Sequence, residues 1–329
     1  MLGVIGAGSW GTALALRAAR NGHATLLWEH DPAAAERLQR DRENRHYLPG
    51  ISFPDELQIT SSLSDCIKQC DLVLVVVPSA AFRQVIEQLK PELTAAQGLV
   101  WASKGLDQET GQLLNQVANE VLGEDFPKAV ISGPSFALEV ALQKPTAVSL
   151  ASNNTALGRR IINYLHADTF RIYLSEDMAG VCLGGAYKNV LAIAAGIADG
   201  LELGLDARAA LITRGLAEMQ RLGLALGGHP ETFMGLAGLG DLVLTCTGDL
   251  SRNRRLGMAL ASGDTVEKIQ TGIGQVTEGV ETARVIHKLA ATYKTDLPIA
   301  EEVYQVLFEG RPAKAAVDTL LAREPRQEF

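Results

Sequence analysis

The chain has 329 residues, of which 47% are hydrophobic and 21% charged, and its formal net charge is -8 at pH 7. This length is sufficient for two domains with separate cores, and the composition is typical of a compact soluble protein. The negative charge excludes a general nucleic-acid-binding surface, which requires a clustered positive field. An anionic substrate would therefore need a local basic pocket.

No uninterrupted apolar run reaches the roughly 20 residues of a membrane-spanning helix. Met1 is followed at once by a strand-like segment, without the features of a secretory leader. We therefore expect a cytoplasmic protein without stable membrane insertion. The cysteines lack a second cysteine or histidine cluster that would complete a zinc site, so we expect reduced, buried thiols and no metal. They are Cys66, Cys70, Cys182 and Cys246.

Short β-branched runs alternate with helical patterns over the first half of the chain. The expected strands lie at residues 2–5, 24–29, 71–77, 98–103, 128–132, 146–151 and 169–174. Continuous apolar strands separated by helices are typical of a parallel sheet covered on both faces. After Asp177 the pattern becomes helical to the C-terminus. The prediction is an α/β fold, with an N-terminal doubly wound parallel (Rossmann) sheet over residues 1–180 and an all-helical domain over 181–329.

A glycine-rich turn follows the first expected strand. Gly6, Gly8 and Gly11 form a GxGxxG pattern that opens a helix. Within a strand–turn–helix–strand unit, this pattern predicts a dinucleotide site. The first glycine permits the tight turn, the second admits the pyrophosphate, and the third lets the helix pack on the strand. The anion would lie at the helix N-terminus.

The second expected strand ends at residues 28–32, WEHDP, where a Rossmann domain selects its cofactor. An acid there would bind the ribose hydroxyls of NAD, whereas a cationic or neutral side chain would tolerate the 2′-phosphate of NADP. Both kinds of residue are present, so the sequence leaves NAD and NADP open. Asp31 before Pro32 has the pattern of a helix N-cap, which makes His30 the favoured cofactor contact.

Polar residues follow two further strands, at the carboxyl ends where a doubly wound sheet binds ligands. Lys104 comes after the strand at 98–103, and Gly133 and Ser135 come after the strand at 128–132. We expect Lys104 to contact an anion or a carbonyl group. The turn at Gly133 offers free N–H groups to an oxygen atom, a role compatible with Ser135 as a helix N-cap.

A lysine and an acid occupy apolar surroundings in the second half. Lys188 lies in the almost wholly apolar, helical segment 183–198. Burying an ammonium group costs several kcal/mol unless it is paired or its pKa falls. Asp241 lies between Gly240 and the apolar run Leu-Val-Leu, and a buried carboxylate also needs a partner. We therefore expect Asp241 to pair with Lys188.

A possible anion site opens the helix after Asp241. Ser251, Arg252 and Asn253 combine free backbone N–H groups, a guanidinium and an amide, which suit a phosphate group. The alternative is a helix capped by Asp249 or Ser251 with its arginines merely exposed.

With these residues assembled, the chain resembles the bacterial NAD(P)-dependent sn-glycerol-3-phosphate dehydrogenases. The similarity spans nearly the whole chain, and eight ordered motifs are more specific than any one of them. The motifs are GAGSWGTALA (6–15), SKGL (103–106), SGPSFA (132–137), GGAYKNVLAIAAGIADG (184–200), RGLAEM (214–219), GLAGLGDLVLTCT (235–247), SRNRRLG (251–257) and QVTEG (275–279).

The resemblance implies a set of site residues, with Lys188 as the general acid/base. It implies cofactor contacts from Ser9, Trp10, His30, Tyr47, Lys104, Ala137, Arg252, Val276 and Glu278. It implies substrate contacts from Lys104, Gly133, Ser135, Lys188, Asp241, Ser251, Arg252 and Asn253. It also implies a homodimer, and a role in supplying glycerol 3-phosphate for phospholipid synthesis.

One departure from neighbouring families bears on the substrate. The β-hydroxyacid dehydrogenases resemble this chain in a GxxxK pattern, here Gly184 to Lys188, but they place Asn four residues after the lysine. Here that position is Ala192, and Asn189 adjoins the lysine instead. The difference disfavours a hydroxyacid substrate.

The resulting hypothesis is a reversible hydride transfer between the nicotinamide and C2 of dihydroxyacetone phosphate. Lys188 would deliver a proton to the developing alkoxide, Asp241 would orient Lys188, and Lys104 would stabilise charge. Two alternatives are a reductase of another small carbonyl or hydroxyacid substrate, and an NAD(P)-sensing protein without turnover. A sensor has no need for a buried lysine paired with an acid, so this pairing favours the enzyme.

Overall fold

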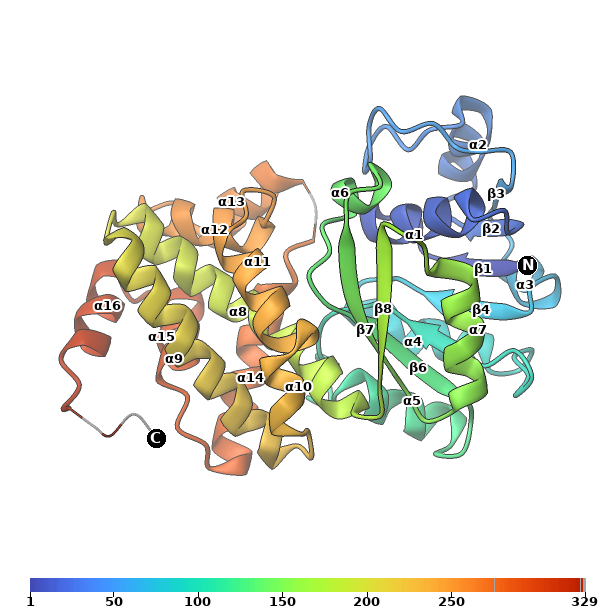
Figure 1. The fold of residues 1–329 in the computed structure, drawn as a ribbon. Helices are drawn as coiled ribbons and strands as arrows, with labels where there is room; N and C mark the ends of the chain where they lie inside the picture. Colours follow the sequence, from blue (N-terminus) through green and yellow to red (C-terminus); the bar gives the residue numbers. More distant parts are fainter. Residues whose placement is uncertain (275, 326, 328–329) are drawn as a thin grey trace.

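The computed structural model describes residues 1–274, 276–325 and 327, and it has a sheet-containing part and a helical part side by side (Figure 1). One eight-stranded sheet has the order β3-β2-β1-β4-β5-β6-β7-β8. The strands are β1 (Leu2–Ile5), β2 (Thr25–Trp28), β3 (Leu57–Thr60), β4 (Leu72–Val75), β5 (Leu99–Trp101), β6 (Lys128–Ser132), β7 (Thr146–Ser152) and β8 (Phe170–Ser175). This order confirms the predicted doubly wound sheet.

Two details of the sheet differ from the prediction. The edge strand β3 was not expected, because Gln58 and Thr60 make half of its four residues polar. The pair β6 and β7 is antiparallel, whereas the other neighbours are parallel. The link between β6 and β7 holds only the five-residue helix α6 (Ala137–Ala141), whereas the crossover between parallel strands usually contains a longer helix that packs on the sheet.

Helices cover both faces of the sheet, because successive strand residues point to opposite sides. In β4, Val73 and Val75 join one apolar core, and Leu72 and Leu74 join the other. The covering helices are α1 (Ser9–Arg20), α2 (Pro32–Asp41), α3 (Leu63–Lys68), α4 (Ser79–Leu89), α5 (Leu114–Leu122) and α7 (Thr155–Leu165). The core that contains Val73 continues without a break into the helical part.

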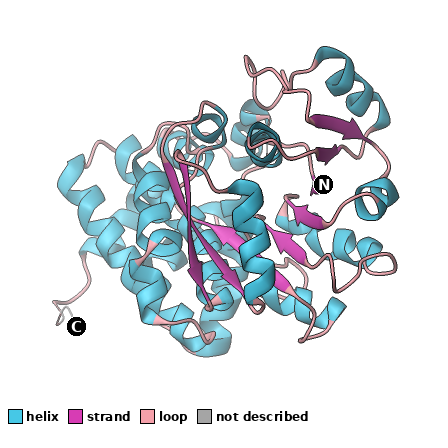
Figure 2. Ribbon diagram, turned by 45° about the vertical axis from the view of Figure 1, so that its right-hand side comes forward, coloured by secondary structure: helices cyan, strands magenta, loops and turns pink. Residues whose placement is uncertain are grey.

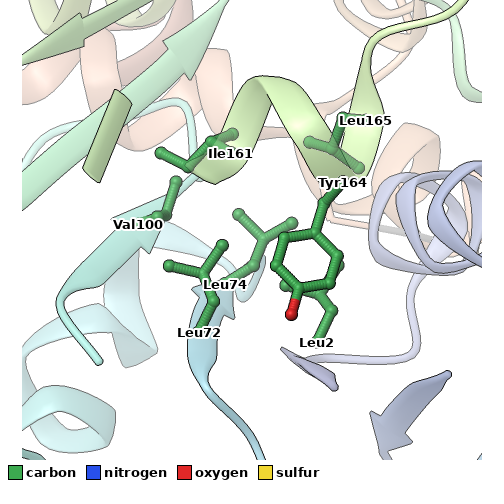
Figure 3. A pocket seen from close by; sticks show the side chains of 7 residues that line it. All are labelled: Leu2, Leu72, Leu74, Val100, Ile161, Tyr164 and Leu165. Carbon is green, nitrogen blue, oxygen red and sulfur yellow. The ribbon is translucent and has the colours of Figure 1, made fainter. Parts of the chain in front are cut away.

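Helix α7 packs on the other face of the sheet and leaves a small gap there. Figure 3 shows Ile161, Tyr164 and Leu165 of α7 facing side chains of β1, β4 and β5 across the gap. The lining is aliphatic apart from Tyr164, whose hydroxyl accepts a hydrogen bond from the Met1 amino group (3.3 Å). With no charged side chain in its lining, this gap belongs to core packing.

The rest of the chain, beside the sheet, is helical (Figure 2). It is built around α8 (Met178–Gly200), which contacts several of the later helices. By length and hydropathy alone α8 could span a membrane, but its most apolar stretch is wholly buried inside the protein. The later helices are α9 (Gly204–Ala225), α10 (Pro230–Met234), the short π-helix η1 (Leu236–Gly240), α11 (Asp241–Thr247), α12 (Arg252–Ala261), α13 (Val266–Ile273), α14 (Glu278–Tyr293), α15 (Pro298–Phe308) and α16 (Ala313–Leu321).

Candidate active site

The glycine-rich turn between β1 and α1 has the shape that a dinucleotide requires. Gly6 has a φ of +116°, and a Cβ on Gly11 would lie 1.9 Å from the Gly6 carbonyl oxygen. A Cβ on Gly8 would meet nothing within 4 Å, and α1 has no side-chain cap at its N-terminus. Open space beside uncapped N–H groups fits a pyrophosphate. The residues present therefore suit the cofactor that the sequence implies.

Four of the expected cofactor contacts gather beside this turn. Ser9 Oγ donates a hydrogen bond to the Tyr47 carbonyl oxygen (3.0 Å). The Trp10 Nε1 atom is buried and finds no partner among the described residues. Lys104 Nζ lies 5.9 Å from the centroid of the Trp10 ring. The loop after β5, which carries Lys104, therefore also lies beside the glycine-rich turn.

The end of β2 carries the residues expected to select the cofactor. Asp31 Oδ1 accepts a hydrogen bond from Ala33 N (3.0 Å), which confirms Asp31 as the N-cap of α2. The side chain of His30 is 80% exposed, and its Nδ1 lies 2.7 Å from Glu29 Oε1.

Asp241 lies between two lysines. Lys188 Nζ donates to Asp241 Oδ1 (2.5 Å), which confirms the expected pair, and Lys104 Nζ donates to Asp241 Oδ2 (2.9 Å). Burial lowers the pKa of Lys188 to about 8, an effect that Asp241 opposes and Lys104 reinforces. One carboxylate thus holds two ammonium groups, and one of those can exchange its proton near neutral pH.

Two glycines of α8 allow Lys188 and Asp241 to come into contact. A Cβ on Gly184 would lie 2.4 Å from the Ala237 carbonyl oxygen of η1, and a Cβ on Gly185 would lie 2.6 Å from Ser132 Oγ at the end of β6. Their absence of side chains lets η1 and β6 approach α8 closely. Asp241, the first residue of α11, follows η1 directly and so reaches Lys188.

The loops after β5 and β6 meet at Lys104. Its Nζ donates to the Gly133 carbonyl oxygen (2.9 Å) and to Ser135 Oγ (3.3 Å) as well as to Asp241. Ala137 follows as the first residue of α6. The structure therefore brings together the predicted residues Lys104, Gly133, Ser135, Lys188 and Asp241.

The start of α12 combines both readings of its sequence. Ser251 Oγ accepts from Arg254 N (3.2 Å) and caps the helix. Arg254 is not merely exposed, because its Nε lies 2.6 Å from Asp199 Oδ2. Burial lowers the pKa of Arg252, and the nearby carboxylate of Glu278 opposes this. The half-buried Arg252 guanidinium has the positive charge and the fork of donors that suit an anion such as a phosphate.

Asn253 does not lie open at this helix start. Its side chain is buried, donating to Asn189 Oδ1 (2.9 Å) and accepting from Gly279 N (3.1 Å). It therefore ties α12 to α8 and α14.

Glu278 reaches back to the sheet-containing part. Its carboxylate accepts from Ser79 N (3.0 Å) and Ser79 Oγ (2.5 Å) at the start of α4. Burial raises the pKa of Glu278, and the Ser79 hydrogen bonds oppose that rise. Val276, two residues before Glu278, is 54% exposed. Gln275 of the same motif lies outside the described residues.

Two family models match the chain in succession. The N-terminal model of NAD-dependent glycerol-3-phosphate dehydrogenase covers residues 1–158, and the C-terminal model covers residues 177–318. The chain belongs to this dehydrogenase family. It is accordingly an oxidoreductase that uses NAD or NADP.

Full-length relatives agree with this family. The glycerol-3-phosphate dehydrogenase [NAD(P)+] of Aeromonas salmonicida is 51% identical over 99% of this chain and 98% of its own length. That of Methylococcus capsulatus is 52% identical over 100% and 98%. The crystal structure of glycerol-3-phosphate dehydrogenase from Coxiella burnetii superposes with a TM-score of 0.95, at 47% identity, and covers 98% of each chain.

Sequence reasoning missed three residues that this dehydrogenase places around its site. Ser79 binds Glu278, and Asn189 binds Asn253. Thr245 Oγ1 donates to the Asp241 carbonyl oxygen (2.6 Å), one turn along α11. The position of Ser79 directly after the β4 segment was an available signal, because ligand-contacting residues gather at such strand ends.

Proposed function

We propose that this enzyme catalyses the reversible NAD(P)-dependent reduction of dihydroxyacetone phosphate to sn-glycerol 3-phosphate, which supplies phospholipid synthesis. The observation that carries the proposal is the buried Lys188–Asp241 pair beside Lys104, at the carboxyl ends of β5 and β6. Family membership supports the same reaction. A non-catalytic sensor would need the glycine turn but not this pair.

The chain's own residues can manage the proton of this reaction. The bound nicotinamide cofactor supplies or accepts the hydride. Protonated Lys188 donates its proton to the substrate oxygen at C2, and neutral Lys188 takes the proton back in the reverse direction. Asp241 fixes the position of the Lys188 ammonium, and Lys104 provides a second positive charge beside the oxygen as charge develops there.

The same proposal assigns the ligand contacts. We propose that the cofactor lies along Gly6, Gly8, Ser9, Trp10, Gly11, His30, Tyr47, Lys104, Ala137, Arg252, Val276 and Glu278. We propose that the substrate is held by Lys104, Gly133, Ser135, Lys188, Asp241, Ser251, Arg252 and Asn253. In this scheme residues 1–180 bind the cofactor, and residues 181–329 supply the proton and most substrate contacts.

The direct test follows absorbance at 340 nm with purified protein and dihydroxyacetone phosphate, with NADH and NADPH in separate cuvettes. Oxidation that depends on dihydroxyacetone phosphate is expected. If both cofactors bind and neither is oxidised, the substrate assignment fails and another small carbonyl compound or a sensor takes its place.

Replacing Arg252 with alanine should chiefly raise the KM for dihydroxyacetone phosphate. The guanidinium would bind the phosphate, remote from the bond that reacts, so its loss weakens binding and orientation. The measurement is KM and kcat for the variant. Arg255, an exposed neighbour in α12, provides the matched control when it is replaced with alanine. An unchanged KM in Arg252→Ala would move the phosphate site elsewhere.

We also propose that the enzyme is a cytoplasmic homodimer. Two leucines at the start of α9 are exposed, Leu203 to 40% and Leu205 to 71%. Beside them, α9, α15 and α16 border a cavity of about 770 Å³ that is lined by apolar residues such as Leu211 and also by charged ones such as Arg214 and Glu302. Exposed apolar area of this kind is typical of a protein interface.

Light scattering should report about twice the 35.1 kDa chain mass at micromolar concentration. Leu205→Asp should shift the distribution towards monomer, because it places a charge in the apolar contact. A monomeric wild-type protein at these concentrations would contradict the dimer.

A further inference from the structure

The end of β2 is where a Rossmann domain distinguishes NAD from NADP, and here it carries two carboxylates in succession around one histidine. Asp31 is engaged in the backbone, because it caps α2 through Ala33 N. Glu29 is the residue directly after β2 and lies opposite the glycine-rich turn, since Trp28, just before it, accepts a hydrogen bond from Gly6 N (3.1 Å). Glu29 is therefore the acid placed at the ribose end of the proposed cofactor groove.

The carboxylate of Glu29 is held in one position. Its Oε1 accepts from Asp31 N (3.1 Å) and lies 2.7 Å from His30 Nδ1. The side chain is only 11% exposed, and its backbone N–H donates to the Thr60 carbonyl oxygen of β3 (2.9 Å). An exposed glutamate can swing away from an approaching anion, but one fixed in this way cannot do so without breaking these contacts.

The nearby basic side chains already face carboxylates. His30 directs Nδ1 at Glu29, and Arg37 Nη2 of α2 lies 3.8 Å from Asp31 Oδ2. A 2′-phosphate would have to draw His30 and Arg37 away from these partners and approach the fixed carboxylate of Glu29. A ribose with free hydroxyls would instead donate hydrogen bonds to that carboxylate.

We propose that Glu29 is the specificity-determining residue for the cofactor and makes this enzyme prefer NADH to NADPH. The inference rests on the cofactor placement proposed above. Glu29 accepts hydrogen bonds from the adenosine ribose hydroxyls of NADH, and its fixed negative charge opposes the 2′-phosphate of NADPH. His30 and Arg37 remain paired with acids when NADH is bound.

The test is the dissociation constant of NADH and of NADPH, measured by titration calorimetry so that it does not depend on turnover. The wild-type protein should bind NADH at least about tenfold more tightly than NADPH. Glu29→Gln should reduce this ratio by about tenfold or more, mainly by tightening NADPH, because the amide removes the negative charge while keeping the shape. Glu36→Gln, the same charge change at an exposed site on α2, should leave the ratio unchanged.

Two results would overturn the proposal. One is a wild-type protein that binds NADPH as tightly as NADH or more tightly, a result that holds even if Glu29→Gln fails to fold. The other is a folded Glu29→Gln protein with the wild-type ratio. If Arg37→Ala or His30→Gln weakens NADPH binding tenfold in a protein that prefers NADPH, these basic side chains select the cofactor instead. If NADH binds normally but is not oxidised in the 340 nm assay, the assignment of dihydroxyacetone phosphate as substrate fails, and the role of Glu29 in cofactor preference is unaffected.

Discussion

Replacing Lys188 with alanine should lower kcat for dihydroxyacetone phosphate reduction by two to four powers of ten, the usual order for loss of a general acid/base. The buried ammonium is the proton source in the proposed reaction, and its neighbour Lys104 is committed to Gly133, Ser135 and Asp241. KM should change far less than kcat, because the proton matters in the transition state. The measurement is steady-state kinetics at 340 nm.

Lys128 supplies a matched control for this variant. It is another buried lysine, at the opposite end of β6 from Gly133, and its Nζ donates to the Gly123 and Glu124 carbonyl oxygens. Lys128→Ala should lose stability while keeping kcat. Near wild-type turnover in a folded Lys188→Ala protein would reject the acid/base role.

The pH dependence gives an independent reading of the same group. Lys188 must be protonated to donate a proton, and its pKa is lowered to about 8 by burial. Reduction of dihydroxyacetone phosphate should therefore decline as the pH rises through about 8, and oxidation of glycerol 3-phosphate should decline as the pH falls through the same value. Both limbs should be absent from the residual activity of Lys188→Ala.

Replacing Asp241 with asparagine should lower the free energy of unfolding by about 3–5 kcal/mol, because buried Lys188 and half-buried Lys104 lose their shared counter-charge. Asp241 is 1% exposed and contacts both Lys188 and Lys104. Without it the pKa of Lys188 falls further, since Asp241 is the group that opposes the effect of burial. The falling limb of the reduction profile should move to lower pH, and kcat at neutral pH should drop. Urea unfolding and the pH profile measure the two effects.

Asp199 separates the structural part of this effect from the catalytic part. It also binds two cations, Arg208 and Arg254, but it lies three turns along α8 from Lys188. Asp199→Asn should destabilise the protein while leaving the pH profile in place. A stable Asp241→Asn protein with the wild-type profile would remove Asp241 from the proposed mechanism.

The strand content was largely predictable, because buried parallel strands need apolar β-branched runs that stand out between helices. Two features lay outside that signal. β3 is a half-polar edge strand, so its residues Leu57–Thr60 resemble a loop. The direction of β7 depends on the link through α6. The sequence of the strand itself, TAVSLAS, would suit a parallel or an antiparallel strand equally well.

The site was predictable where a buried charge demanded a partner, as with Lys188 and Asp241. It was not predictable where either partner is ordinary on its own. Ser79 and Glu278 are 199 residues apart in sequence, and nothing in either segment indicates the other. Asp241 also accepts a hydrogen bond from Lys104. This contact depends on how closely Gly185 lets the end of β6 approach α8, which only the packed structure reveals.

The Lys188 side chain projects from α8, which is buried continuously from Gly180 to Ala198, and not from a surface loop. Its ammonium is therefore oriented when the chain folds. The entropic cost of orienting it is met during folding and does not recur in each turnover. The same arrangement makes the chemistry sensitive to distant packing. A substitution that displaces α8 against its neighbours by a fraction of an ångström displaces the proton donor with it.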